Sequence, residues 1–353
     1  MNDWLVIGDI FDTQDGGANK PNRVRWSAFN NPTTSWATDR GELASFRDLD
    51  PKYGRITGIV EGQRGIVFQE RAIWRMTFVG APKVFEFEPI AEDRGCVSPH
   101  AAVTVGYRTY FWDRGGLFVT NGSEVQPVGD EILNETLEKE VNQGLWALIH
   151  GSVNWPERSI LWTYTPQTGG GLRRHLIYSF VTQQWASAEV AVDWTVQTDQ
   201  ASQTLGSLSA TYPTLDDAGS LPVGNPDWIG TDRALGAFIA SGSGSEMADF
   251  SGETLEALFQ TGDFALKPGK RTHVSGISPI IEIEGGDVYC STVSRSRQGK
   301  ALSETQEYMP GVDGFAPQQV DNWFHRFKVR IPAGSAWEKA SGVWVRGKVS
   351  GAR

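Results

Sequence analysis

One short pattern occurs twice in the first half of the chain at a fixed offset. The segments are RGIVFQERAIWRMTFVG and YRTYFWDRGGLFVTNG. Both are rich in aromatic and β-branched residues, and in both an acidic residue followed by an arginine interrupts the apolar pattern. The matched positions, each pair 43 residues apart, are Phe68 and Phe111, Glu70 and Asp113, and Arg71 and Arg114. Four short antiparallel strands with their turns fill about 40 to 50 residues, which is one blade of a β-propeller. A single blade cannot bury both faces, so the recurrence predicts that residues 54–129 form two consecutive sheets packed face to face.

The composition favours strands and tight turns over helices. The 353 residues include 14 Trp and 17 Phe but 4 Met, together with 40 Gly and 17 Pro. The predicted fold class is all-β: a β-propeller-like ring of antiparallel blades with one bridging helix and a C-terminal β-sheet layer. Because the chain is too long for one simple core, we expect a β-propeller-like domain over residues 1–270. Residues 271–353 would form a C-terminal β-rich blade or an appended domain.

The hydrophobic pattern places the elements of the repeated unit. Alternating apolar residues predict strands near 56–60, 65–70, 72–79 and 85–87, and again near 101–105, 109–113, 117–120 and 124–128. Leucine, isoleucine and valine then recur every three or four residues from Ile132 to Leu148, which predicts one amphipathic helix bridging two sheets. Residues 199–227 are rich in Ser, Asp, Gly and Pro and predict a long loop.

Charge and cysteine content exclude several classes of protein. The net charge is -10 and the isoelectric point is near 5.1, so the summed field repels polyanions and affinity for nucleic acid is not expected. Cys96 and Cys290 are too far apart in sequence for a metal motif and are expected to be buried or half-buried thiols. The apolar run Trp4 to Ile7 is too short for a signal peptide or a membrane span, which favours synthesis as a soluble cytoplasmic product.

One C-terminal strand combines a cationic and an apolar face. Arg326, Lys328 and Arg330 alternate with apolar residues, and alternate residues of a strand point to opposite faces. The cationic face is either a solvated strand surface or a rim that contacts an acidic partner.

The sequence contains none of the common catalytic or metal-binding motifs. The five histidines lie apart from cysteines and carboxylates, and the HExxH, CxxC, GxSxG and Walker patterns are missing. We therefore expect no catalytic residues, no cofactor, no metal and no enzymatic activity. Glycosidases need only two carboxylates, and Glu70 and Asp113 could line a central channel at equivalent positions of neighbouring blades. Alternatively, these two acids form salt bridges to Arg71 and Arg114.

Several segments together resemble the tail nozzle, or packaged-DNA-stabilisation, proteins of short-tailed bacteriophages. The segments are RVRWSAFNNPTTSW at 23–36, the stretches 65–87 and 94–132, the hairpin ending in SFVTQQW, and the closing FHRFKVRIPAGSAWEKASGVWVRGKVSG. They span most of the chain. In this sequence 22 residues precede the first segment, fewer than is usual in the family, so the first blade is expected to be incomplete, or completed by a neighbouring chain or by the C-terminal strands.

The resemblance implies a structural protein of the virion tail, made in the host cytoplasm. Such a subunit assembles with itself into a ring, a hexamer in this family, and contacts other tail proteins such as an adaptor, a fibre or a needle. The ring retains packaged DNA and later lets it pass without binding it specifically. Under this interpretation Glu70 and Asp113 line the lumen, and Arg326, Lys328 and Arg330 contact a neighbouring protein. The alternative is a propeller-type tail protein that binds or cleaves host surface glycans.

Overall fold

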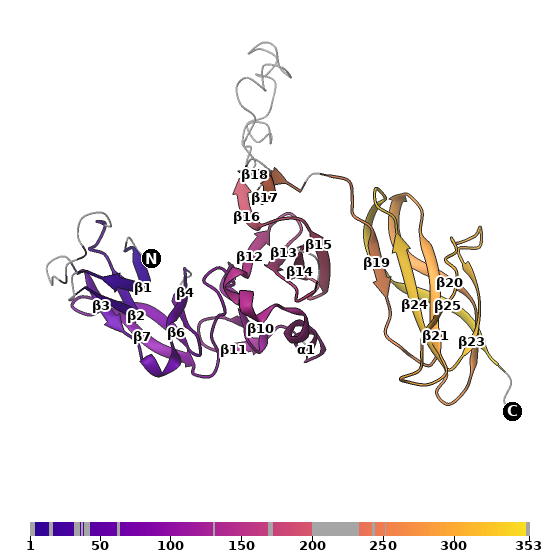
Figure 1. Cartoon of the computed structure of the whole chain (residues 1–353), viewed down its shortest axis with the longest axis horizontal. Helices are drawn as coiled ribbons and strands as arrows, with labels where there is room; N and C mark the ends of the chain where they lie inside the picture. Colours follow the sequence, from indigo (N-terminus) through magenta and orange to yellow (C-terminus); the bar gives the residue numbers. More distant parts are fainter. Residues whose placement is uncertain are drawn as a thin grey trace, which may run out of the picture. The chain divides into compact units, whose positions relative to one another are not determined.

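The protein consists of two compact units, shown in a computed structural model (Figure 1). Unit 1 is Met1–Phe250 and unit 2 is Ser251–Arg353, so the division lies earlier than the boundary at residue 270 expected from sequence. The structure describes residues 4–13, 17–31, 36, 38, 43–61, 64–129, 131–168, 172–199, 233–241, 244–250 and 252–350. Most of the predicted loop at 199–227 lies outside these residues.

Unit 1 is built from five antiparallel sheets in its described part, each made of strands consecutive in sequence. The first contains β1 (Val6–Asp12), β2 (Ala18–Trp26) and β3 (Ser45–Asp48). The second contains β4 (Ile56–Val60), β5 (Gly65–Gln69), β6 (Ile73–Gly80) and β7 (Val84–Ala91). The third contains β8 (Val103–Val105), β9 (Arg108–Asp113), β10 (Gly116–Thr120) and β11 (Val125–Pro127). The fourth contains β12 (His150–Asn154), β13 (Ser159–Tyr164), β14 (Arg173–Ser179) and β15 (Trp185–Val190). The fifth contains β16 (Trp194–Asp199), β17 (Arg233–Ser241) and β18 (Gly244–Asp249).

Three of the four pairs of neighbouring sheets in the described part of unit 1 meet along their first strands. Strand β1 contacts β4, β8 contacts β12, and β12 contacts β16. Four-stranded meanders whose first strands lie together are the arrangement of propeller blades. The predicted all-β, propeller-like class is therefore confirmed. The recurrence at 43 residues corresponds to the second and third sheets.

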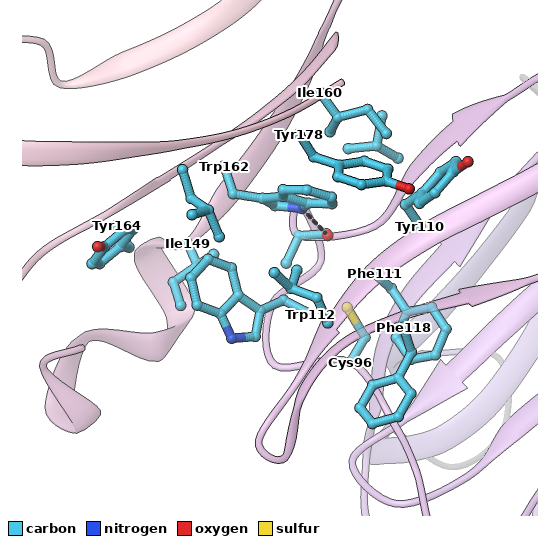
Figure 2. Packing of buried hydrophobic residues seen from close by; sticks show 14 of the residues in the cluster. Cys96, Tyr110, Phe111, Trp112, Phe118, Ile149, Ile160, Trp162, Tyr164 and Tyr178 are labelled. Carbon is cyan, nitrogen blue, oxygen red and sulfur yellow. Dashed lines mark hydrogen bonds between the residues drawn. The ribbon is translucent and has the colours of Figure 1, made fainter. Parts of the chain in front are cut away.

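An aromatic core joins the second, third and fourth sheets (Figure 2). The ring of Trp112 meets that of Tyr164 at 5.5 Å between centroids, and Tyr110 meets Tyr178 at 5.8 Å. The buried indole of Trp162 donates a hydrogen bond to the carbonyl oxygen of Ala101 at 3.0 Å. Because these residues alternate along β9 and β13, each strand contributes side chains to the space between sheets. The core thus ties these three sheets into one body.

The predicted helix is shorter than the hydrophobic pattern indicates. Helix α1 covers Glu131–Glu140, and a 3₁₀ segment, η2, covers Gln143–Leu148. Between them Val141 forms a β-bridge with Pro166, and the side chain of Asn142 accepts a hydrogen bond from the backbone of Gly144. Asparagine favours such local bonds over a helix interior, so one continuous helix over residues 132–148 is wrong.

Helix α1 does bridge two sheets, as predicted. Leu137 is buried in the shared core, and Asn134 accepts a hydrogen bond from the backbone of Leu117 on β10 at 3.4 Å. On the other side Glu140 accepts a bond from the hydroxyl of Tyr164 on β13 at 2.6 Å. The helix therefore connects the third and fourth sheets by packing and by polar contacts.

Unit 2 contains two antiparallel sheets packed face to face. One has the order β19 (Ala257–Gln260), β24 (Phe324–Ile331), β21 (Tyr289–Arg295) and β22 (Ser303–Glu304). The other has the order β23 (Ala316–Asn322), β20 (Thr272–Gly285) and β25 (Ala336–Val349). Val274 and Ile277 of β20 pack with Phe327 and Val329 of β24 in a separate core.

Each unit holds one of the two cysteines of the chain. Cys96 lies in the core of unit 1 and Cys290 in that of unit 2, and both are free and buried, which confirms the prediction of buried thiols. Burial disfavours the thiolate and raises the pKa of both thiols to about 12.

Candidate functional site

Glu70 and Asp113 occupy equivalent turns of neighbouring sheets. Glu70 follows β5 and Asp113 ends β9, so each lies at the turn between the second and third strands of its sheet. Both line one pocket of about 400 Å³ between the second and third sheets. We call this pocket the inter-sheet cleft. The structure therefore brings together the two acids that the recurrence singled out.

Asp113 has a structural role within the cleft. Its side chain is nearly buried, and its two oxygens accept hydrogen bonds from the backbone amides of Gly95 and Gly115, each at 3.0 Å. Its ion-pair partner is Arg94 at 3.5 Å, and not the adjacent Arg114 that the sequence suggested. A carboxylate satisfied by two amides and a guanidinium is held in one orientation. Asp113 thus fixes the turn and the chain segment before β8.

A close backbone approach joins the two equivalent turns. A Cβ at Gly95 would lie 2.2 Å from the carbonyl oxygen of Gln69, at the end of β5. Only glycine allows this contact. Gly95 also donates to Asp113 of the next turn, so this one residue couples the second sheet to the third.

The side chains of Glu70 and Arg114 are the uncommitted charges of the cleft. Both residues are exposed, and within the part of the chain that the structure describes neither side chain has a hydrogen bond or ion pair. Arg71, the neighbour proposed from sequence to pair with Glu70, instead donates to the carbonyl oxygen of Lys52 at 2.6 Å. A free carboxylate and a free guanidinium can accept and donate hydrogen bonds to a ligand.

The remaining wall of the cleft mixes an ion pair, an indole and an amide. Asp9 of β1 forms a salt bridge with Arg55, and both residues line the pocket. Trp146 and Gln143 enter it from η2. The pattern of core residues could not identify Trp146, because the sequence placed it on a continuous helix whose end does not form.

A second, larger cavity adjoins the cleft at Arg114. It measures about 1050 Å³ and lies between the turn of β9 and β10, strand β11 and helix α1. Arg94 stands over the ring of Phe118 at 4.6 Å in this cavity. The acidic residues that line it are Asp93, Glu124, Glu135 and Glu138. Arg114 lines both cavities, so one cation can contact a ligand from either side.

The cationic residues of β24 in unit 2 are matched by carboxylates of the same unit. Arg326 pairs with Asp263, and Lys328 pairs with Glu304 at 3.0 Å. Arg330 pairs with Glu307 at 2.6 Å and with Glu256 at 3.2 Å. The predicted alternation is present, with half-buried cations and buried apolar residues in turn. The role of Arg326, Lys328 and Arg330 at a partner contact stays a prediction.

The described residues contain neither a metal-binding cluster nor a membrane-spanning helix. There, no group of three or more His, Cys, Asp or Glu side chains is placed to hold a metal ion. No described helix has both the length and the apolar content that a bilayer crossing requires.

Comparisons with known proteins return only solved structures. No family model and no curated protein matches the chain. A glycoside hydrolase matches with 9% identity over 98% of this chain and 95% of its own, at a TM-score of 0.27. An exo-β-1,3-galactanase from Phanerochaete chrysosporium, crystallised with β-1,3-galactotriose, matches with 9% identity over 97% of this chain and 100% of its own, also at 0.27.

These neighbours correct one prediction. Because they are enzymes, the expectation that this chain is not an enzyme is contradicted and is withdrawn. At this identity and TM-score no residue, substrate or reaction is transferred from them to this chain.

Proposed function

We propose that this chain is a propeller-type protein that binds glycans in the inter-sheet cleft. The observation that carries the proposal is that the Glu70 carboxylate and the Arg114 guanidinium, which have no bonded partner among the described residues, line one pocket of about 400 Å³ together with the half-buried indole of Trp146. Pockets for small ligands commonly measure roughly 300 to 1,000 Å³ and hold a few convergent polar groups. Sugar hydroxyls donate to carboxylates and accept from guanidinium groups, and the C–H face of a sugar ring packs on an aromatic ring.

The charges of the cleft favour a neutral sugar over a polyanion. Asp9 is compensated by Arg55, and Asp113 by Arg94. Glu70 and Arg114 then contribute one charge of each sign, so the lining is balanced. The whole chain carries a net charge of -10, which adds a repulsive field for nucleic acid.

If the chain also cleaves a bound glycan, Glu70 is the carboxylate of the cleft best placed to take part. Glycoside hydrolysis requires two carboxyl groups, one acting as an acid and the other as a base or nucleophile. The cleft offers Asp9, Glu70 and Asp113. Of these, Glu70 alone keeps a carboxylate without a bonded partner among the described residues, so the binding assay is paired with an assay for reducing ends.

The test is a glycan titration of the full chain. Wild-type protein is screened on a printed array of neutral and acidic oligosaccharides, and the best binder is titrated by calorimetry. Losing one charge-assisted hydrogen bond should weaken binding by about tenfold or more in Glu70→Gln and Arg114→Gln. Arg297→Gln, at an exposed turn of unit 2, is the control and should bind normally. Wild-type affinity in both cleft variants would refute the proposal.

A second candidate function is the tail ring subunit implied by the resemblance to phage nozzle proteins. An exposed aromatic patch on the first two sheets favours it. The rings of Phe29 and Phe78, 53% and 41% exposed, contact the buried Trp4 ring at 4.7 and 5.2 Å. Exposed contiguous apolar surface is typical of an interaction site, and under this proposal a second copy of the chain covers it.

Oligomeric state separates the second candidate from the first. Mass photometry of the full chain, combined with negative-stain imaging, should show closed rings that Phe29→Glu and Phe78→Glu dissociate into monomers. Leu302→Glu, a comparably exposed position of unit 2, should leave the rings intact. A wild-type monomer at micromolar concentration would rule this candidate out and leave glycan binding unaffected.

A further inference from the structure

An exposed tryptophan stands on the outer face of a sheet of unit 2, whereas the inter-sheet cleft belongs to unit 1. Trp344 lies on β25, the edge strand of the sheet β23–β20–β25, and is 66% exposed. Its partner in the register of β20 is Ser278, a small residue. Gly342, two positions earlier on the same face of β25, has no side chain. The indole therefore has open space along its own strand and directly across it, with the side chain of Ile280 on the diagonal beside Gly342.

A fixed polar group adjoins the indole on the same face. Arg346, two positions after Trp344, donates to the carboxylate of Asp313 at 3.0 Å and stands over the ring of Phe315 at 3.9 Å. Hydrogen bonds from the Phe315 amide and from Arg346 hold the pKa of Asp313 below its usual range. The phenyl ring in turn lies over Gly276, where a Cβ would come within 3.4 Å of the ring carbon Cδ1 of Phe315. Arg346 and Asp313 are thus positioned before any ligand arrives.

The residues around Trp344 favour a sugar as the ligand over a protein partner or a polyanion. Standard protein interfaces bury about 800 Å² on each partner around an apolar centre, whereas β20 places Ser278 directly across from Trp344 and one exposed apolar side chain, Ile280, two positions further on the same face. A polyanion is a poor ligand for this face, because Arg346 is already paired with Asp313 and the whole chain has a net charge of -10. A sugar ring matches one exposed indole beside one donor and one acceptor group.

We propose that the outer face of β20 and β25 binds a glycan, with one sugar ring stacked on Trp344 and its hydroxyls bonded to Arg346 and Asp313. The inference rests on the proposed function for its class of ligand, but it concerns a separate site in a separate unit. The full chain would then carry two glycan sites.

The test uses the full chain on the same glycan array, followed by calorimetry with the best-bound oligosaccharide. Trp344→Ala should weaken binding at one site by about tenfold or more, and Trp344→Phe should recover most of the loss because it keeps an aromatic face. Trp323→Ala, 38% exposed in the same unit, is the control and should bind as wild type. Near-ultraviolet circular dichroism confirms that each variant is folded.

The outcomes separate this inference from the proposed function. If glycan binding is lost in Trp344→Ala and kept in Glu70→Gln, the site on unit 2 is supported and glycan binding in the inter-sheet cleft is refuted. Binding kept in Trp344→Ala and lost in Glu70→Gln overturns the inference and leaves the proposed function in place. A wild-type chain that binds no glycan on the array overturns both.

Discussion

The rings of Phe68 and Phe111 pack at 5.0 Å between centroids, across two neighbouring sheets. They occupy the same position in β5 and β9, 43 residues apart. The sequence recurrence is therefore also a contact: each copy supplies one half of a buried aromatic pair. The prediction of two consecutive sheets packed face to face is confirmed.

Replacing Phe111 should destabilise both sheets at once. Phe111 is fully buried between β5 and β9, and truncating a buried phenylalanine to alanine costs about 3 to 5 kcal/mol. We expect Phe111→Ala to lower the free energy of unfolding of unit 1 by that amount in urea titrations. Tyr107→Ala, 63% exposed on the same sheet, should change it by less than about 0.5 kcal/mol. Equal effects of the two variants would contradict the shared core.

Gly95 should tolerate no side chain. A methyl group there would lie 2.2 Å from the Gln69 carbonyl oxygen, so backbone must move and the bond from Gly95 to Asp113 weakens. Strain and a disturbed buried hydrogen bond together cost on the order of 2 to 4 kcal/mol. Thermal unfolding of Gly95→Ala should reveal this loss. Gly262→Ala, where a Cβ meets nothing within 4 Å, is the matched control; an unchanged melting temperature for Gly95→Ala would show that the two turns are not tightly coupled.

Unit 1 should lose stability as the pH falls below neutrality. The buried ring of His150 accepts a hydrogen bond from the backbone of Thr195 on β16 at 2.9 Å, and the ring of His175 bonds to the hydroxyl of Thr163 at 2.8 Å. The pKa of both histidines is lowered to about 4, chiefly by burial and, for His150, also by the nearby positive Arg173. The folded state of unit 1 therefore favours the neutral form of both imidazole rings.

The sign of the pH dependence follows from these pKa values. An unfolded histidine titrates near 6.5, so the unfolded chain binds more protons between pH 6.5 and about 4. Stability is complete above pH 6.5 and falls as the pH decreases through that window, by about 1.4 kcal/mol per pH unit for each histidine. Urea unfolding at pH 7.5, 6 and 5 measures the slope. A variant His150→Leu should show a shallower slope, and an unchanged slope would mean that His150 is not the group that titrates.

The isolated protein should bind duplex DNA weakly. Its net charge is -10, and the Arg326, Lys328 and Arg330 side chains are already paired with carboxylates. Few phosphate contacts remain, so we expect a dissociation constant weaker than about 0.1 mM at physiological salt. Fluorescence anisotropy with a labelled duplex measures it. Tight binding that weakens steeply with added salt would show that these cations are available to phosphates.

The sequence predicted the repeated sheets well because local pattern and tertiary burial agree there. The alternation over residues 109–113 matches β9, and the turn at Asn121 and Gly122 separates β10 from β11. The predicted length of the bridging helix was too great, because the apolar spacing in the sequence continues past Asn142. In the fold that residue caps a 3₁₀ turn, and its backbone amide donates to the carbonyl oxygen of Thr165, just after β13; the periodicity of the sequence does not reveal this competing bond.

The partners of charged residues could not be predicted from neighbours in sequence. Asp113 pairs with Arg94 and not with Arg114, because the turn carries adjacent side chains in different directions while the segment before β8 folds back onto it. The contacts of Asp9 with Arg55 likewise join different sheets. Such pairs depend on how sheets pack, so the sequence identified two residues of the cleft but not its remaining wall.

The two free cysteines give the molecule an internal reporter in each unit. Cys290 is buried in the core of unit 2, and Cys96 is buried in that of unit 1 beside the inter-sheet cleft. Burial raises the pKa of both thiols to about 12, so a thiol reagent labels each of them only when the chain around it opens. Peptide mass analysis separates the labelling of the two cysteines. The rate at Cys96 would then report local opening in unit 1, and the rate at Cys290 would report local opening in unit 2, in one unmodified chain.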